Sequence, residues 1–301
     1  MTFQRCGIVE GFFGPPWSMS HRAAMFQFAA KRGMNTYLYA PKDDPYHRER
    51  WREPYPESEW KELLKLIRLA RERRIDFVYG FHPGKGLHFA AAEPVDIMLT
   101  KAQRFYDAGV RTFAILFDDI PSRLKHAEDQ KTYGGSHVRG VAKRIKRRLM
   151  LWDNYPVNDL SMSSEMHLGP LTGRDPRLPE SVYGYLNNPL LQEELSFIPL
   201  ATCFDYAANP SAYDPEESWN RVIEERFGRG ALDHWKAIRA YCERAARQKH
   251  KNRALTLPSK HRNALEAAHR YLLKQRERGW VAEFRPWLEL MERSLSGQRK
   301  A

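Results

Sequence analysis

The 301-residue chain has few cysteines and no long apolar run. Its three cysteines, Cys6, Cys203 and Cys242, are odd in number, far apart and without metal-ligand spacing, so we expect no disulfide framework and a reducing compartment. No apolar run approaches the roughly 18 residues of a membrane span, and the first predicted strand begins soon after Met1. We therefore expect no membrane segment and no signal peptide, which favours a cytoplasmic protein.

The chain also lacks the short motifs that bind nucleotides or activate a serine nucleophile. It contains no phosphate-binding loop, no dinucleotide fingerprint and no nucleophile elbow. His82 has no cysteine, histidine or carboxylate at metal-ligand spacing. The sequence therefore favours a packed or hydrogen-bonding histidine over a metal ligand at this position.

The formal net charge of +12 lies almost entirely in one part of the chain. Residues 221–301 contain 20 Lys and Arg against 9 Asp and Glu, which leaves a net charge of about +1 for residues 1–220. The basic side chains recur at helical spacing, without the alternation of glycine and aromatic residues that is typical of RNA-binding segments. The pattern favours a solvated helical surface over a site for an anionic partner, and we do not expect nucleic acid binding.

The 42% apolar content predicts one large α/β domain and a smaller one. Short apolar runs separated by amphipathic patterns indicate strands joined by helices. Because right-handed crossovers make such a sheet parallel, the carboxyl ends of its strands lie on one face, where α/β proteins place their active sites. The predicted strands are residues 6–9, 35–40, 75–81, 112–117, 148–152 and 182–186, and helices are expected near 18–33, 58–74, 95–107 and 138–147.

A closed (β/α)8 barrel needs eight strands, and six can be recognised here. Asn188 followed by Pro189 is typical of a helix start, which predicts a helix running to Tyr206 with a bend near Pro199. We predict an α/β fold: a TIM-type (β/α) barrel reduced to six strands over residues 1–210, followed by an all-α helical bundle over residues 211–301. The helical segments expected in that bundle are residues 216–227, 232–248, 260–276 and 281–295.

Asp118 and Asp119 follow the fourth predicted strand and are the best candidates for catalysis. Two adjacent carboxyl groups can divide the work when one stays ionised and the other has a raised pKa and donates a proton. Glycoside hydrolysis is the reaction most associated with such a pair. The same pair would also fit a solvated loop or a helix cap.

Polar residues at other strand ends suit a carbohydrate site. Lys42 can donate to sugar hydroxyls, while Trp152, Asn154 and Asp159 supply an aromatic plate and hydrogen-bonding groups. Each has a simpler alternative, since Lys42 with its two following aspartates also fits a solvated turn and the asparagine–aspartate pairs also fit Asx turns.

Five motifs, in this order, resemble glycoside hydrolase family 84, the β-N-acetylglucosaminidases that include protein O-GlcNAcases and enzymes once called hyaluronidases. The resemblance covers residues 6 to about 210, less one interruption, and the basic tail is similar to the helical region that follows the catalytic domain in the family. The motifs are residues 7–14, 35–44, 116–120, 152–154 with 158–159, and 188–189.

The resemblance implies retaining hydrolysis of terminal β-linked N-acetylglucosamine with assistance from the substrate. The oxygen of the sugar's 2-acetamido group attacks the anomeric carbon and gives an oxazoline. By position, Asp118 would orient the acetamido N–H, and Asp119 would protonate the leaving oxygen and then activate water. No cofactor or metal is implied, and the expected partner is a glycoconjugate or peptide that carries N-acetylglucosamine. The implied substrate-binding residues are Gly11, Lys42, Trp152, Asn154, Asp159 and Asn188.

The chain departs from the family in one place. The family normally has two more βα units between the aspartate pair and the strand of Trp152, with a Pro-Thr-Glu-Tyr motif whose tyrosine lines the acetamido pocket and a Trp-Thr-Gly segment. Both are absent here, in agreement with the strand count, and the Gly-Gly-Ser sequence within residues 133–137 fits a deletion of engineered or genomic origin. Six strands would leave two edges unpaired, so we expect either a rearranged, smaller barrel or strand exchange in a homo-oligomer.

A second function class stays open from the sequence. The retained aspartates favour an enzyme, whereas the missing tyrosine and strands favour a catalytically impaired protein that binds O-GlcNAc-modified peptides or glycans.

Overall fold

The computed structural model describes residues 2–82, 93–116, 150–247 and 254–296. Backbone contacts divide the chain into two compact units. The sheet unit contains residues 3–153 and 178–186, and the C-terminal unit contains residues 1–2, 154–177 and 187–301. This division does not follow the predicted domain boundary at residue 210, which stays a prediction.

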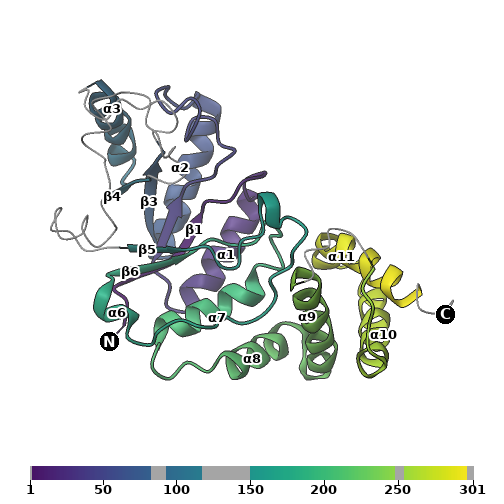
Figure 1. Ribbon diagram of the computed structural model, residues 1–301. Helices are drawn as coiled ribbons and strands as arrows, with labels where there is room; N and C mark the ends of the chain where they lie inside the picture. The colour runs from purple at the N-terminus through teal and green to yellow at the C-terminus, as the bar shows by residue number, and fades with distance from the viewer. Residues whose placement is uncertain (1, 83–92, 117–149, 248–253, 297–301) are drawn as a thin grey trace, which may run out of the picture. The chain divides into compact units, whose positions relative to one another are not determined.

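The sheet unit contains six strands within the described residues, and they run parallel in a curled sheet typical of a reduced TIM-type α/β fold. The strands are β1 (Arg5–Glu10), β2 (Thr36–Tyr39), β3 (Asp76–Phe81), β4 (Thr112–Ile115), β5 (Met150–Asp153) and β6 (Gly184–Asn187). Their order across the sheet is β4-β3-β2-β1-β6-β5 (Figure 1). All six predicted strands are confirmed, with ends within two residues of those predicted.

The strand order locates the interruption of the barrel. In a closed eight-stranded barrel the last strand pairs with the first, and the seventh lies beside the last. Here β6 pairs with β1 and β5 lies beyond β6, so these two take the places of the last two barrel strands. Among the described strands the edges are therefore β4 and β5, and the two further strands of an eight-stranded barrel would fall between them.

Three helices of the sheet unit connect successive strands as predicted. They are α1 (Met19–Lys31), α2 (Glu57–Glu72) and α3 (Glu93–Asp107). The hydroxyl of Ser18 caps α1 by accepting a hydrogen bond from the backbone N–H of His21 at 3.2 Å. A short helix, α6 (Leu178–Ser181), precedes β6. The helix predicted over residues 138–147 lies outside the described residues.

Side chains alternate between the two faces of the sheet. Val9, Leu38 and Val78 stand in register on adjacent parallel strands and begin an apolar layer. We call the side of the sheet that carries this layer the inner face. The layer consists of Val9, Leu38, Ala40, Val78 and Leu186, with Ala114, Leu116 and Trp152 packed against it.

Glu10, at the end of β1, is the centre of a buried polar cluster on the opposite face. Its fully buried carboxylate accepts hydrogen bonds from the backbone N–H of Trp17, from the Tyr37 hydroxyl and from Arg22 of α1. Arg22 donates through Nε at 2.9 Å and through Nη2 at 2.6 Å. Burial alone would lower the pKa of Arg22, but the Glu10 charge raises it overall, so the pair is ionic and fixes α1 against the sheet.

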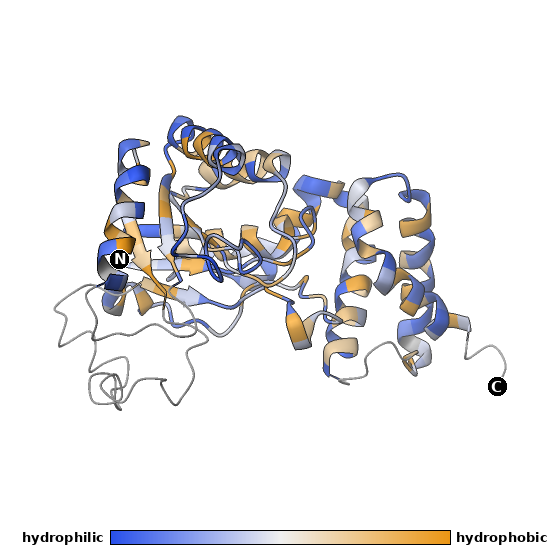
Figure 2. Cartoon of the chain, turned by 90° about the horizontal axis from the view of Figure 1, so that it is seen from above, coloured by the Kyte–Doolittle hydropathy of each residue, from blue (hydrophilic) through white to orange (hydrophobic). Residues whose placement is uncertain are grey.

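The C-terminal unit is helical over most of its described length. The segments predicted after residue 215 are confirmed with ends that differ by one or two residues. Apolar and polar residues alternate along these helices in Figure 2, as expected where one side of a helix is buried. The elements are η1 (Leu160–Met162), α7 (Phe197–Ala208), α8 (Pro215–Phe227), η2 (Arg229–Ala231), α9 (Leu232–Arg247), α10 (Ser259–Lys274) and α11 (Gly279–Ser296).

The helix predicted to follow Asn188 is wrong in its start and in its bend. Residues 188–196 are not α-helical, and α7 begins at Phe197. A long-range contact fixes this segment, because the carboxylate of Glu283 in α11 accepts hydrogen bonds from the N–H groups of residues 194–195 at 3.0 and 3.2 Å. Pro199 consequently lies in the first turn of α7, where proline is tolerated, and not in a helix interior.

Among the described residues, none of the helices combines the length and the apolar character that crossing a membrane would require.

We predict that Glu10→Ala destabilises the protein by about 3–5 kcal/mol, because it leaves the buried Arg22 guanidinium without its carboxylate. The free energy of unfolding in urea would measure this. Glu62→Ala is the matched control, since Glu62 pairs with Lys65 at 2.6 Å on the exposed surface of α2 and should contribute less than about 1 kcal/mol. Equal losses in the two variants would contradict the central role of Glu10.

Candidate active site

Lys42 and Trp152 come together on the inner face of the sheet. The Lys42 side chain is almost fully buried, and its Nζ lies 5.5 Å from the centroid of the Trp152 ring and 5.8 Å from that of Phe13. The backbone N–H of Lys42 donates to the carbonyl oxygen of Phe12 at 3.3 Å, which ties the residue to the segment after β1. A cation held against an aromatic face presents both the hydrogen-bond donors and the flat surface that a sugar ring requires.

Gly11 belongs to the same group for a steric reason. A Cβ atom at this position would lie 2.4 Å from both Cζ2 and Cη2 of Trp152. Glycine therefore leaves the space that the Trp152 ring fills. We call Gly11, Lys42 and Trp152 the Lys42 group, and three of the predicted substrate-binding residues are thus brought together.

Asp44 lies close to Lys42 in the sequence but has a different environment. Its carboxylate accepts hydrogen bonds from the hydroxyls of Tyr39 and Tyr55, each at 2.7 Å, and from the backbone N–H groups of Tyr46 and His47 at 2.9 and 3.2 Å. Lys42 and Asp44 therefore have different roles in the structure. Lys42 contacts Trp152, whereas Asp44 organises the loop between β2 and α2.

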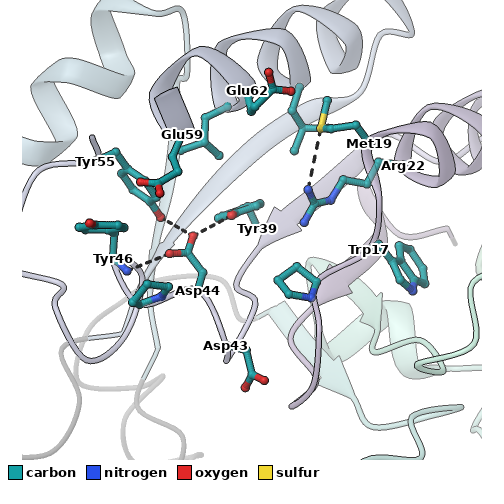
Figure 3. A pocket seen from close by; sticks show the side chains of 14 residues that line it. Trp17, Met19, Arg22, Tyr39, Asp43, Asp44, Tyr46, Tyr55, Glu59 and Glu62 are labelled. Carbon is teal, nitrogen blue, oxygen red and sulfur yellow. Dashed lines mark hydrogen bonds between the residues drawn. The ribbon is translucent and has the colours of Figure 1, made fainter. Parts of the chain in front are cut away.

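A cavity of about 360 Å³ lies beside Asp44, on the side of β2 that faces α1 and α2 (Figure 3). Tyr39, Tyr46 and Tyr55 line it together with Asp43 and side chains from both helices. Figure 3 shows the hydrogen bonds of the tyrosines converging on Asp44. Lys42 does not line this cavity, so it is separate from the Lys42 group.

Two buried histidines lie behind the Lys42 group. The rings of His47 and His82 have their centroids 6.0 Å apart, and both side chains are almost fully buried. Burial lowers the pKa of His47 well below its ordinary value, and the nearby His82 and Lys42 lower it further. His47 is therefore neutral at physiological pH, and His82 is a packed residue as the sequence predicts.

Asn154, Asp159 and Asn188 form a second group, within the C-terminal unit. Asn154 and Asn188 directly follow β5 and β6 in the chain, and the Asn188 amide donates to the Asn154 side-chain oxygen at 3.2 Å. The Asn188 carbonyl accepts from the N–H of Val157 at 3.0 Å. Asp159 is largely buried at the start of η1. Internal hydrogen bonds thus hold this group in a defined arrangement.

The neighbouring Asn158 braces this second group. Its amide donates to the carbonyl of Glu165 at 3.0 Å and to the side chain of Gln192 at 2.8 Å, and its oxygen accepts from the N–H of Leu191 at 3.1 Å. Periodicity along the chain does not predict these partners, because they come from loops that only the fold brings together.

The catalytic candidates Asp118 and Asp119 lie outside the described residues, as does the Gly-Gly-Ser junction. The Lys42 group and the group of Asn154, Asp159 and Asn188 belong to different units. That all of these residues surround one sugar stays a prediction. Among the described residues, no cluster of three or more histidine, cysteine or carboxylate side chains could hold a metal ion.

A family model for β-N-acetylglucosaminidase matches residues 6–140 and 131–241. The match thus falls into two segments that meet within the stretch between β4 and β5, which is where the strand order places the missing part of the barrel.

The chain is also similar to characterised proteins. It is 30% identical to the protein O-GlcNAcases of Rattus norvegicus and of Mus musculus in an alignment 267 positions long, which covers 65% of this chain and 29% of each relative. The chain therefore spans less than a third of the length of these relatives.

Among solved structures, a mutant O-GlcNAc hydrolase from Thermobaculum terrenum is similar with a TM-score of 0.82 and 26% sequence identity, over 96% of this chain and 82% of that one. The family match extends over most of the chain and includes every predicted site residue. The chain is a member of the β-N-acetylglucosaminidase family, glycoside hydrolase family 84.

Proposed function

We propose that this protein hydrolyses terminal β-linked N-acetylglucosamine, with retention of configuration and through an oxazoline intermediate. The observation that carries the proposal is the family match across the sheet and the segments that follow it. The Lys42 group supports it, since a buried ammonium beside a tryptophan ring suits the hydroxyls and the apolar face of a pyranose. No feature of the described residues favours the alternative of an impaired binding protein.

In the proposed first step, the acetamido oxygen of the substrate attacks the anomeric carbon while the bond to the leaving oxygen breaks. Asp118 holds the acetamido N–H, and Asp119 gives its proton to the leaving oxygen. In the second step Asp119 removes a proton from water as that water opens the oxazoline, which releases N-acetylglucosamine.

Substrate binding is assigned to both groups of polar residues. Lys42 donates to sugar hydroxyls, Trp152 provides the stacking surface, and Gly11 leaves room for that ring. Asn154, Asp159 and Asn188 supply further donors and acceptors from the C-terminal unit. Because the mammalian relatives are named protein O-GlcNAcases, the substrate class we propose is an O-GlcNAc-modified protein.

The remaining proposals concern organisation. We assign residues 1–210 to the shortened catalytic barrel and residues 211–301 to a helical bundle that carries most of the positive charge. The open edges β4 and β5 are the surfaces through which a second copy of the chain would pair, since unpaired strand edges associate readily.

We expect the protein to elute as a dimer in size-exclusion chromatography with light scattering. Ile115→Lys, which places a charge at the end of edge strand β4, should shift the population toward monomer. Leu99→Lys, at a comparably exposed apolar position on α3, is the control and should leave the dimer intact. A stable wild-type monomer would rule out strand exchange.

The role of Asp119 predicts a dependence on the leaving group. Asp119→Asn should slow hydrolysis of an O-GlcNAc-serine peptide by about 10²–10⁴-fold, but that of 4-nitrophenyl β-N-acetylglucosaminide much less, because 4-nitrophenolate leaves without a proton. Asp118→Asn should slow both substrates similarly, since the acetamido group attacks in both reactions. If Asp119→Asn and the wild type hydrolyse both substrates at equal rates, the enzymatic proposal fails.

Gly11→Ala should displace the Trp152 ring, with a loss of about 1–3 kcal/mol in stability and a KM raised about tenfold. Gly230→Ala is the control, because a Cβ there meets no atom within 4 Å. Trp152→Phe removes the two ring atoms that clash, so the double variant should recover the stability lost in Gly11→Ala. Additive losses in the double variant would count against the steric explanation.

A further inference from the structure

The loop of residues 40–56, between β2 and α2, carries Lys42 and contains no regular helix or strand. Turns pair some of its backbone groups, as where the N–H of Arg50 donates to the carbonyl of Pro45 at 2.7 Å, and side chains bind others. Asp44 makes one set of these bonds from within the loop, as described above. A second set comes from Lys101 of α3.

Lys101 holds three carbonyl groups of this loop. Its Nζ donates to the carbonyl oxygens of Tyr46 at 2.6 Å, Trp51 at 3.0 Å and Glu53 at 2.9 Å. An ammonium group has three N–H donors and no acceptor, so all its donors are used. The Lys101 side chain is 8% exposed, which means that water cannot readily replace these bonds.

Asp44 and Lys101 act on the same two residues. The N–H of Tyr46 donates to Asp44, and the carbonyl of Tyr46 accepts from Lys101. The Tyr55 hydroxyl donates to Asp44, and the Tyr55 ring lies 4.9 Å from the Lys101 Nζ. The loop is thus fixed from both sides, by an anion within it and a cation outside it.

The charge on Lys101 is retained at neutral pH despite its burial. Burial lowers its pKa to about 8, while Asp44 and Glu53 oppose that shift. Within the described residues, Lys101 forms no ion pair within 4 Å, and its three hydrogen bonds all go to backbone carbonyls. Burying a charge costs desolvation free energy, and bonds to neutral carbonyls offset only part of it. We infer that Lys101 is retained because it fixes one conformation of the loop.

The part of the loop that Asp44 and Lys101 fix is close to Lys42 in the chain. Lys42 lies two residues before Asp44, and the N–H of Asp44 donates to the carbonyl of Pro41 at 3.2 Å. The charges of Lys42 and Lys101 both lower the pKa of the buried His47, so both ammonium groups lie near that residue.

We propose that Lys101 is a positioning residue for N-acetylglucosamine binding: it holds the loop of residues 40–56 so that Lys42 stays beside Trp152. The proposal rests on the proposed function of the Lys42 group. Lys101 itself does not touch the substrate.

The test is Lys101→Met, which keeps the length and apolar volume of the side chain but removes all three donors. Lys101→Gln, which retains two N–H donors, is the second variant. It allows the proposal to be tested if Lys101→Met does not fold. Gln103→Met is the matched control, since Gln103 lies on the same helix and bonds only to the exposed Asp107 at 2.8 Å. The probes are the thiazoline analogue of the oxazoline, by calorimetry, and 4-nitrophenyl β-N-acetylglucosaminide, by steady-state kinetics.

We expect Lys101→Met to raise the Kd of the thiazoline and the KM about tenfold or more, with kcat within about threefold of the wild type. Lys101→Gln should fall between it and the wild type, and Gln103→Met should match the wild type. Amide hydrogen exchange in residues 41–56 should accelerate in the two Lys101 variants only. A purely structural role would lower the active fraction, and hence kcat, without changing Kd.

The two proposals fail in different ways. If the wild type neither binds the thiazoline nor hydrolyses the glycoside, the proposed function fails, and the positioning role fails with it. If the wild type does both, but Lys101→Met and Lys101→Gln keep the Kd and the loop exchange of Gln103→Met, the positioning role alone is overturned.

Discussion

The parallel register of the central strands is the constraint on which the rest of the structure depends. With Val9, Leu38 and Val78 side by side, every second residue of each strand faces the inner layer and the others face the helices. The inner positions continue past the strand ends into Gly11 and Lys42, next to Trp152. The outer positions carry Glu10 and Tyr39, whose hydroxyl binds Asp44. The alternation of side chains along the strands therefore places the candidate substrate-binding residues on the inner face and the residues that stabilise the fold on the outer face.

The two faces use charge differently. On the outer side, Glu10 with Arg22 and Asp44 with its tyrosines form satisfied buried networks, each of which fixes a segment next to the inner face. Lys101 extends this arrangement to the loop that bears Lys42. A flexible lysine is thereby presented from a rigid backbone, and preorganisation of this kind lets binding energy go into substrate contacts rather than loop ordering.

The shortened barrel keeps the parts of the family fold that bring distant segments together. Because β6 pairs with β1, the last two strands of the described sheet remain joined to the first four without passing through the segment between β4 and β5. A barrel can lose consecutive strands in this way and retain the adjacency of its first and last strands, since that contact does not pass through the gap.

The sequence by itself determined the six strands, three of the connecting helices and the family, and it proposed Lys42 and Trp152 as site residues, because these follow from local periodicity and short motifs. Only the tertiary structure decided that Asp44 supports the loop, that Gly11 makes room for an indole ring, and that residues 188–196 are not helical. Lys101 and Glu283 show the reason. Each acts on backbone groups about 50 or 90 residues away, and no pattern along the chain records a contact that folding alone creates.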